Sequence, residues 1–136
     1  MKKSLRIVIY TPEGKEYEHE CEFVQVHTSD TYLGILPEHA PLISDVQISK
    51  LLVRIDGVDN VFAVGDGMLY IKNNEVKLIV SSLESADEID IERALAAKQR
   101  AEDRLAGKLV DAENLDVKRA KAALARALVR IDISKK

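Results

Sequence analysis

The chain has 136 residues, of which 46% are hydrophobic, and this suffices for one or two small domains with a true core. It contains no apolar run long enough for a membrane-spanning helix, and its single cysteine, Cys21, excludes an internal disulfide. The net charge of −3 is unevenly shared: residues 1–85 carry 8 basic and 13 acidic side chains, whereas residues 116–136 carry 7 basic and 2 acidic ones. The basic end can therefore attract the acidic first part or an acidic partner.

Strands are expected up to about Glu84, because apolar residues recur there with a period of two. Turn residues arrive about every ten positions, for example at 11–14 and 55–57, a spacing typical of a sandwich or barrel of short antiparallel strands. The polar stretch 15–22 predicts an exposed or edge strand, and residues 46–54 predict one longer strand.

Residues 33–42 combine two prolines with four leucine or isoleucine residues. Proline excludes a central strand or helix, yet the stretch is too apolar for a solvated loop, so it predicts a fixed, partly buried crossing between sheets. His39 within it is expected to be a structural, hydrogen-bonded histidine. Its spacing from His19, His27 and Cys21 is not that of a metal site.

Residues 65–67, Gly-Asp-Gly, predict a tight β-turn and not a phosphate loop, because no Gly-Lys-Ser/Thr ending and no helix follow. No Gly-x-Ser-x-Gly motif occurs, and Cys21 lies between two glutamates whose charge would raise the pKa of its thiol. The sequence thus indicates no catalytic residue, no metal site and no required cofactor. An enzyme is the least favoured function.

From Ser85 onward the apolar period changes to 3.6, which predicts two helices. Ser85 and Glu88 form a capping-box pattern, so the first helix is expected to begin there, and Asn114 or Asp116 is expected to cap the second. Alanine makes up much of the predicted faces, so the pair should be thinly packed and able to leave the sheet half. The faces consist of Ile91, Ala94, Leu95, Ala101, Leu105 and Leu109 in the first helix, and Val117, Ala120, Leu124, Ala127 and Ile131 in the second.

Each predicted helix also carries a row of arginines with spacings of seven and four residues. The planar guanidinium suits recognition of phosphate or carboxylate. Three interpretations stay open: solvated rows paired with carboxylates such as Glu92, Glu102 and Asp103, a site for an anionic ligand, or a site for an acidic protein surface. The rows consist of Arg93, Arg100 and Arg104, and of Arg119, Arg126 and Arg130.

Three stretches, taken in order, resemble the epsilon-subunit family of bacterial F-type ATP synthases: 33–42, 62–67 and 89–94. The similarity covers nearly the whole chain. It implies an α+β fold, with a ten-stranded antiparallel β-sandwich in residues 1–84 and an antiparallel α-helical hairpin in residues 85–136.

The resemblance also implies a non-catalytic central-stalk subunit that couples proton flow to ATP synthesis. Its implied partners are the gamma subunit, the c-ring and the catalytic alpha and beta subunits, at the cytoplasmic face of the bacterial cell membrane and without insertion into it. The mobile hairpin would restrain ATP hydrolysis. Glu38 and Asp66 stand where many relatives have glycine, and with His39 they are implied to face gamma or the c-ring.

In some family members ATP binds the folded hairpin as a regulatory ligand. The resemblance then implies that Asp90 contacts the ribose or adenine side of ATP, or orients Arg93. It also implies that the arginines hold the phosphates. An alternative is a stand-alone ATP-sensing or adaptor module with no motor role. A nucleic-acid binder is disfavoured by the few aromatic residues and the acidic sheet half. The residues matching the ATP-binding pattern are Glu84, Asp90, Arg93, Arg100, Arg119, Arg126 and Arg130.

Overall fold

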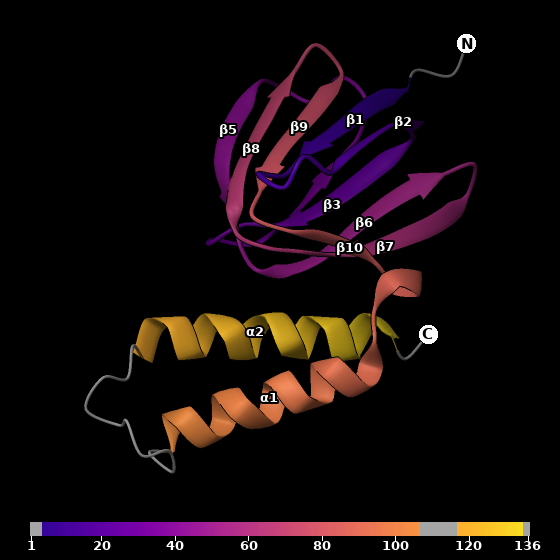
Figure 1. Ribbon diagram of the computed structural model, residues 1–136. Helices are drawn as coiled ribbons and strands as arrows, with labels where there is room; N and C mark the ends of the chain where they lie inside the picture. The colour runs from indigo at the N-terminus through magenta and orange to yellow at the C-terminus, as the bar shows by residue number, and fades with distance from the viewer. Residues whose placement is uncertain (1–3, 107–116, 135–136) are drawn as a thin grey trace.

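The computed structural model of the chain describes residues 4–106 and 117–134. Within these ranges ten strands form two five-stranded sheets, and two antiparallel helices follow them (Figure 1). The predicted α+β architecture, a β-sandwich followed by a helical hairpin, is confirmed. The expected helix positions Leu109, Asn114 and Asp116 lie outside the described residues.

Each sheet combines pairs of consecutive strands with pairs that are distant in the sequence. The first has the order β2-β1-β9-β8-β5 and the second the order β10-β7-β6-β3-β4. The pairing is antiparallel except between β1 and β9, which run parallel. The strands are β1 (Leu5–Tyr10), β2 (Glu16–Cys21), β3 (Phe23–His27), β4 (Tyr32–Ile35), β5 (Leu42–Val46), β6 (Ser49–Ile55), β7 (Val58–Val64), β8 (Gly67–Lys72), β9 (Glu75–Val80) and β10 (Leu83–Ser85).

The core lies between the inner faces of the two sheets. Alternate residues of each strand point into it, as the period of two predicts. Ile7 and Leu78 of the first sheet and Val24, Leu51 and Val53 of the second are fully buried. The expected edge strand is also confirmed, since β2 lies at the edge of its sheet with most of its side chains exposed.

The prediction of one longer strand over residues 46–54 is wrong. The first sheet ends β5 at Val46, and β6 begins at Ser49 in the second sheet. The chain turns between them, where the Gln47 N–H donates to the His27 carbonyl at 2.9 Å. The stretch therefore contributes to the core from both sheets, because Val46 and Leu51 enter the same core from opposite sides.

The predicted crossing at 33–42 is confirmed. Strand β4 is the edge of the second sheet and β5 the edge of the first, so the segment between them passes from one sheet to the other. Ile35 is fully buried, but Leu36 is 61% exposed, so the apolar character of the crossing is only partly used for burial. The His39 ring bonds through Nδ1 to the Ala40 carbonyl at 2.7 Å, as expected for a structural histidine.

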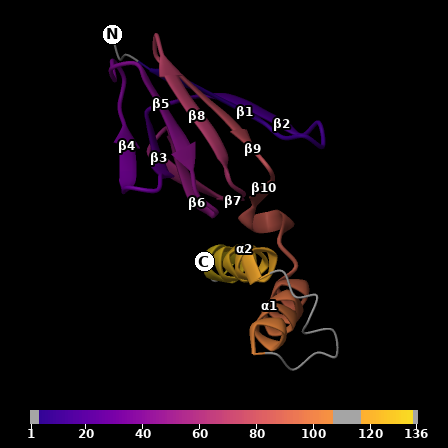
Figure 2. The ribbon, with the colours of Figure 1, turned by 90° about the vertical axis from the view of Figure 1, so that its left-hand side faces the viewer.

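Helix α2 (Val117–Ser134) lies between the sandwich and helix α1 (Ile91–Leu105), as Figures 1 and 2 show from two directions. It contacts β6 and β7 on one side and α1 on the other. Helix α1 is therefore connected to the sandwich covalently, through the segment that follows β10, while α2 makes most of the packing contacts between the hairpin and the sandwich.

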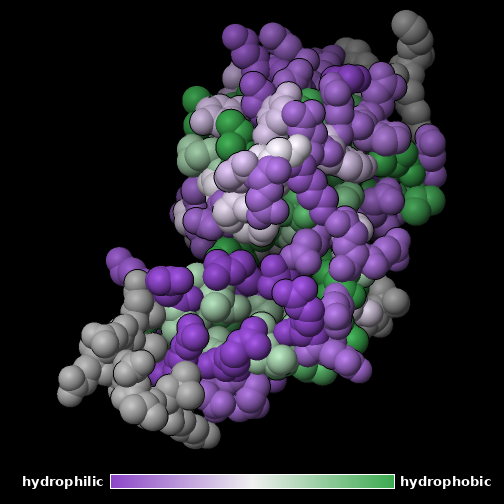
Figure 3. Space-filling view, in the orientation of Figure 1, coloured by the Kyte–Doolittle hydropathy of each residue, from purple (hydrophilic) through white to green (hydrophobic). Residues whose placement is uncertain are grey.

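Alanine forms the seam of the hairpin, as predicted. Ala94 and Ala101 of α1 and Ala120 and Ala127 of α2 are buried, and both pairs are seven residues apart. Figure 3 shows weakly hydrophobic, pale-green surface between the purple residues of the two helices. The assignment of Ile91, Leu95 and Val117 to the buried faces is wrong, because they are 39%, 49% and 46% exposed. Small residues bring the helix axes close together. The larger side chains beside the alanine seam do not fit between the helices and stay exposed to solvent.

The predicted helix start at Ser85 is also wrong. The Glu88 carboxylate accepts from the Ser85 N–H and hydroxyl, but this pattern caps only the 3-10 turn Ala86–Glu88. Ile89 then returns to an extended conformation, and α1 begins one residue after Asp90. Asp90, and not the Ser85–Glu88 pattern, therefore sets the start of α1.

Candidate functional site

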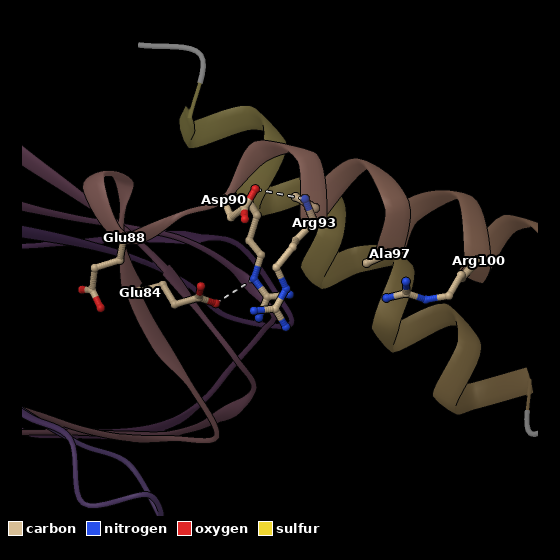
Figure 4. Close-up of a pocket in the computed structure, with 8 residues that line it drawn as sticks. Glu84, Glu88, Asp90, Arg93, Ala97 and Arg100 are labelled. Carbon is tan, nitrogen blue, oxygen red and sulfur yellow. Dashed lines mark hydrogen bonds and ion pairs between the residues drawn. The ribbon is translucent and has the colours of Figure 1, made fainter.

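A pocket of about 220 Å³ lies where β10, the 3-10 turn and both helices meet (Figure 4). Each element contributes polar side chains, so the pocket forms only when the hairpin lies against the sandwich. Carboxylates come from the sandwich side and from the start of α1, and guanidinium groups come from both helices. Its lining residues are Glu84, Glu88, Asp90, Arg93, Ala94, Ala97, Arg100 and Arg130.

Most of the residues that the sequence nominated for an anion site are brought together here. Glu84, Asp90, Arg93, Arg100 and Arg130 all line the pocket. Arginines seven residues apart on α1 lie on one face, which is what the spacing predicted.

Two nominated arginines lie elsewhere. Arg126 lines a small neighbouring cavity with Val129 and Arg130 of α2 and residues of the sandwich. Arg119 precedes Arg130 by eleven residues, which is about 16 Å along a helix axis, and it lines neither cavity. The row on α2 is thus spread along the helix, and its last member is the one that reaches the pocket.

Sequence reasoning missed three lining residues: Glu88, Ala94 and Ala97. Glu88 was expected only to cap a helix, and Ala94 only to pack. Ala97 lies four residues after Arg93 and three before Arg100, so the same spacing that defined the arginine row could have found it. Its small side chain leaves room between the two guanidinium groups.

The Arg130–Glu84 ion pair connects the last helix to the sandwich. Arg130 Nε donates to Glu84 Oε1 at 2.6 Å, and the two side chains are 29% and 28% exposed. Partial burial shields this pair from water more than the pairs Arg6–Glu18, Lys15–Glu88 and Arg54–Asp59, whose side chains are 38–53% exposed. Neither Arg93 nor Arg100 forms an ion pair with a carboxylate of the described residues.

Asp90 is engaged in starting α1. Its Oδ1 accepts from the Glu92 N–H at 3.1 Å and from the Arg93 N–H at 3.2 Å. It therefore fixes the backbone of Arg93 at the mouth of the pocket, and a carboxylate at this position also interacts favourably with the positive end of the helix dipole. Figure 4 shows the Arg93 side chain running from this cap toward Glu84.

Glu88 faces away from the arginines in Figure 4 and bonds to Lys15. The hydrogen bond from Lys15, and then those from Ser85, lower the pKa of Glu88 below its ordinary value of 4.5. Because the pKa is lowered on folding, the stabilisation is complete above the unfolded pKa and is lost as pH falls through the folded one.

We expect this titration to appear in the stability of the chain. The difference in unfolding free energy between wild type and Glu88→Gln, measured by urea unfolding, should be constant above about pH 5.5 and shrink below about pH 4.5. The effect should be small and reduced by salt, because both partners of the pair are exposed. A difference that stays constant down to about pH 3 would contradict the assignment.

The three nominated partner-binding residues do not form one patch. The Glu38 N–H donates to Asn74 Oδ1 at 2.6 Å, so Glu38 and His39 lie at the end of the sandwich where β8 turns into β9. Asp66 lies at the opposite end of β8, where it accepts from the Ser81 hydroxyl at 3.0 Å. A partner that contacts all three would have to span the length of the sandwich.

The described residues contain no group of three His, Cys, Asp or Glu side chains placed to hold a metal ion. Within the same part of the chain, no helix is long and apolar enough to cross a membrane. The chemistry that the pocket offers is ionic: guanidinium groups for an anion and carboxylates for a hydrogen-bond donor.

Two family models match consecutive parts of the chain. The beta-sandwich domain of the ATP synthase delta/epsilon chain matches residues 4–86, and the long alpha-helix domain of the same chain matches residues 87–135. The chain belongs to the ATP synthase delta/epsilon chain family. The resemblance to the epsilon subunit is thereby confirmed.

Bacterial members of the delta/epsilon chain family are similar over most of the chain. The ATP synthase epsilon chain of Desulforamulus reducens is 44% identical over 108 residues, covering 79% of this chain and 82% of the relative. That of Bacillus licheniformis is 37% identical over 133 residues, covering 98% and 99%. The similarity therefore includes the sandwich and the hairpin together.

Chains of two solved structures share the fold of this chain. A chain of the Euglena gracilis mitochondrial ATP synthase, solved as OSCP, F1 and c-ring, matches with a TM-score of 0.77 at 14% identity, covering 98% of this chain and 82% of that one. A chain of the Tetrahymena thermophila central stalk and c-ring matches with a TM-score of 0.54 at 16% identity, covering 99% and 97%. At these identities the likeness supports the fold alone.

Proposed function

We propose that the chain is a non-catalytic central-stalk subunit of a proton-translocating F-type ATP synthase. It binds the gamma subunit and the c-ring through its sandwich and couples proton flow to ATP synthesis, as a peripheral protein on the cytoplasmic face of the bacterial membrane. Its hairpin moves between a compact state and one that reaches the catalytic alpha and beta subunits and restrains ATP hydrolysis. ATP bound in the pocket favours the compact state.

The observation that carries the regulatory part is the pocket between the sandwich and the hairpin. Arg93 and Arg100 line it without a carboxylate partner among the described residues, and Arg130 is tied to Glu84. Guanidinium groups bind phosphate oxygens in pairs of charge-assisted hydrogen bonds. An anion that lies between α1 and the sandwich therefore holds the hairpin in its compact place.

The size of the pocket limits how a nucleotide fits. A volume of about 220 Å³ lies below the roughly 300–1,000 Å³ of most ligand pockets. The neighbouring cavity lined by Arg126 and Arg130 would have to open into it. We therefore expect Arg130 to exchange its bond to Glu84 for a phosphate contact when ATP binds.

Energetics limits what ATP does alone. A ligand at 100 times its dissociation constant stabilises the binding state by about 2.7 kcal/mol. A shift from 1:99 to 99:1 between two states needs about 5.5 kcal/mol. ATP would therefore bias the hairpin toward the compact state, and contacts with the rotor and the catalytic subunits would supply the rest.

Calorimetry on the isolated chain tests the ATP site. Arg93→Ala and Arg100→Ala should each weaken ATP binding about 10- to 100-fold, the range for losing a hydrogen bond to a charged group. Arg104→Ala is the matched control, because Arg104 lies on α1 but does not line the pocket. Equal affinities in all three variants would reject the pocket as the ATP site.

Locking the hairpin tests its role in hydrolysis. Ser82 and Val129 line the same small cavity, one on the sandwich side and one on α2. A bifunctional maleimide joining Ser82→Cys to Val129→Cys, in a Cys21→Ala background, should hold the compact state. The assembled ATPase should then hydrolyse ATP faster than with the same variant before cross-linking, and an unchanged rate would contradict the inhibitory role.

A further inference from the structure

The 3-10 turn that precedes α1 is held by a lysine from the far end of the sandwich sequence. Lys15, in the turn between β1 and β2, donates from Nζ to the Leu83 carbonyl at 2.7 Å and to the Glu88 carboxylate at 2.5 Å. Leu83 is itself buried and pairs with Val64 of β7. One ammonium group thus joins the first hairpin of the sandwich, its last strand and the 3-10 turn.

The backbone of Lys15 is held in place, because hydrogen bonds between Lys15 and Thr11 close the turn between β1 and β2. The Thr11 N–H donates to the Lys15 carbonyl at 3.1 Å, and the Lys15 N–H donates to Thr11 Oγ1 at 3.1 Å. Gly14, with φ of 86°, supplies the left-handed residue that this turn needs. The base of the lysine side chain therefore moves with the sandwich.

The side-chain hydrogen bonds of the connecting segment divide at Ile89, whose own N–H donates back to the Ala86 carbonyl at 3.4 Å. Glu88 bonds backward, through one oxygen to Ser85 and through the other to Lys15. Asp90 bonds forward, to the first N–H groups of α1. Ile89 lies between the two carboxylates in an extended conformation, with φ of −82° and ψ of 126°.

We propose that Lys15 clamps the 3-10 turn to the sandwich and that the hairpin pivots at Ile89. This inference rests on the mobile hairpin of the proposed function. Everything up to Glu88 then stays with the sandwich, and everything from Asp90 onward moves. The pocket divides in the same way: its two glutamates stay, and its arginines leave with the hairpin. The site is therefore intact only in the compact state, so the affinity for an anion depends on the position of the hairpin.

Spin-label distances on the full chain test the pivot. In a Cys21→Ala background, a label at Val58→Cys, on the exposed tip between β6 and β7, is paired with Asp87→Cys or with Gln99→Cys. Arg130→Glu opposes Glu84 with a second carboxylate and drives the hairpin open. We expect the Val58–Gln99 distribution to broaden and the Val58–Asp87 distribution to stay narrow. Broadening of both would overturn the pivot at Ile89.

The clamp is tested without opening the hairpin. Lys15→Met keeps the length of the side chain and removes its donors, and it should broaden the Val58–Asp87 distribution on the order of twofold as the turn is released. Lys77→Met on β9 is the matched control and should leave the distribution unchanged. An unchanged distribution in Lys15→Met would overturn the clamp. Neither readout depends on nucleotide or on hydrolysis, so failure of the proposed function would be seen separately.

Discussion

Gly67→Ala is expected to destabilise the sandwich by about 3 kcal/mol, the upper end of the range for forcing extra atoms into a packed site. Gly67 begins β8 and is paired on both sides, with Val46 of β5 and with Val80 of β9. A Cβ at this position would collide with the Ile79 carbonyl oxygen and the Val80 Cα, which are both backbone atoms. No side-chain rotation relieves that clash, so the sheet itself must move.

Two other glycines complete a graded series. At Gly65 a Cβ would meet mainly the hydroxyls of Ser81 and Ser82, which can turn aside, so Gly65→Ala should cost less. At Gly57 nothing lies within 4 Å, and only the φ of +77° opposes a side chain, which costs about 1–2 kcal/mol. Urea unfolding should rank the losses in this order with unchanged m-values. A Gly67→Ala loss no larger than that of Gly57→Ala would contradict this account.

The sandwich was largely predictable because its signals are local. A period of two and regular turns locate most of the strands, and the same alternation selects the buried side chains. The order of the strands was not predictable in this way. The parallel pairing of β1 with β9 joins residues about seventy positions apart, and no turn pattern records it.

The errors came from signals that two structures can share. The stretch 46–54, in which apolar and polar residues are mixed, fits one long strand as well as two strands facing one core from opposite sheets. The Ser85–Glu88 pattern fits the start of a helix as well as a single 3-10 turn, and only the second cap at Asp90 separates them. Local preference cannot decide such cases, because the choice is made by tertiary packing.

The candidate site was predictable along one helix but not across elements. The spacing of Arg93 and Arg100 is by itself enough to place them on one face of a helix. The partnership of Glu84 with Arg130 spans 46 residues and depends on which side of α2 faces the sandwich. The helical period predicts which residues share one face of a helix. It does not predict what that face contacts, because this depends on how the hairpin packs against the sandwich.

Exchanging the charges of Glu84 and Arg130 should separate docking from ligand binding. Glu84→Arg alone and Arg130→Glu alone each place like charges at a contact that is now 2.6 Å, so each should release α2 from the sandwich. The double variant restores an opposite pair in the same place. A double-mutant cycle should give a coupling of about 1–2 kcal/mol, above the value for an exposed pair because these side chains are partly buried.

Hydrogen exchange in α2 is the readout for docking, because its backbone N–H groups lose protection when the helix leaves the sandwich. We expect exchange to rise about 5- to 30-fold in each single variant and to return toward wild type in the double variant. ATP affinity should fall in Arg130→Glu and stay low in the double variant, since the guanidinium then lies on the opposite wall of the pocket. Recovery of both properties together would mean that Arg130 acts on the nucleotide only by holding the hairpin in place.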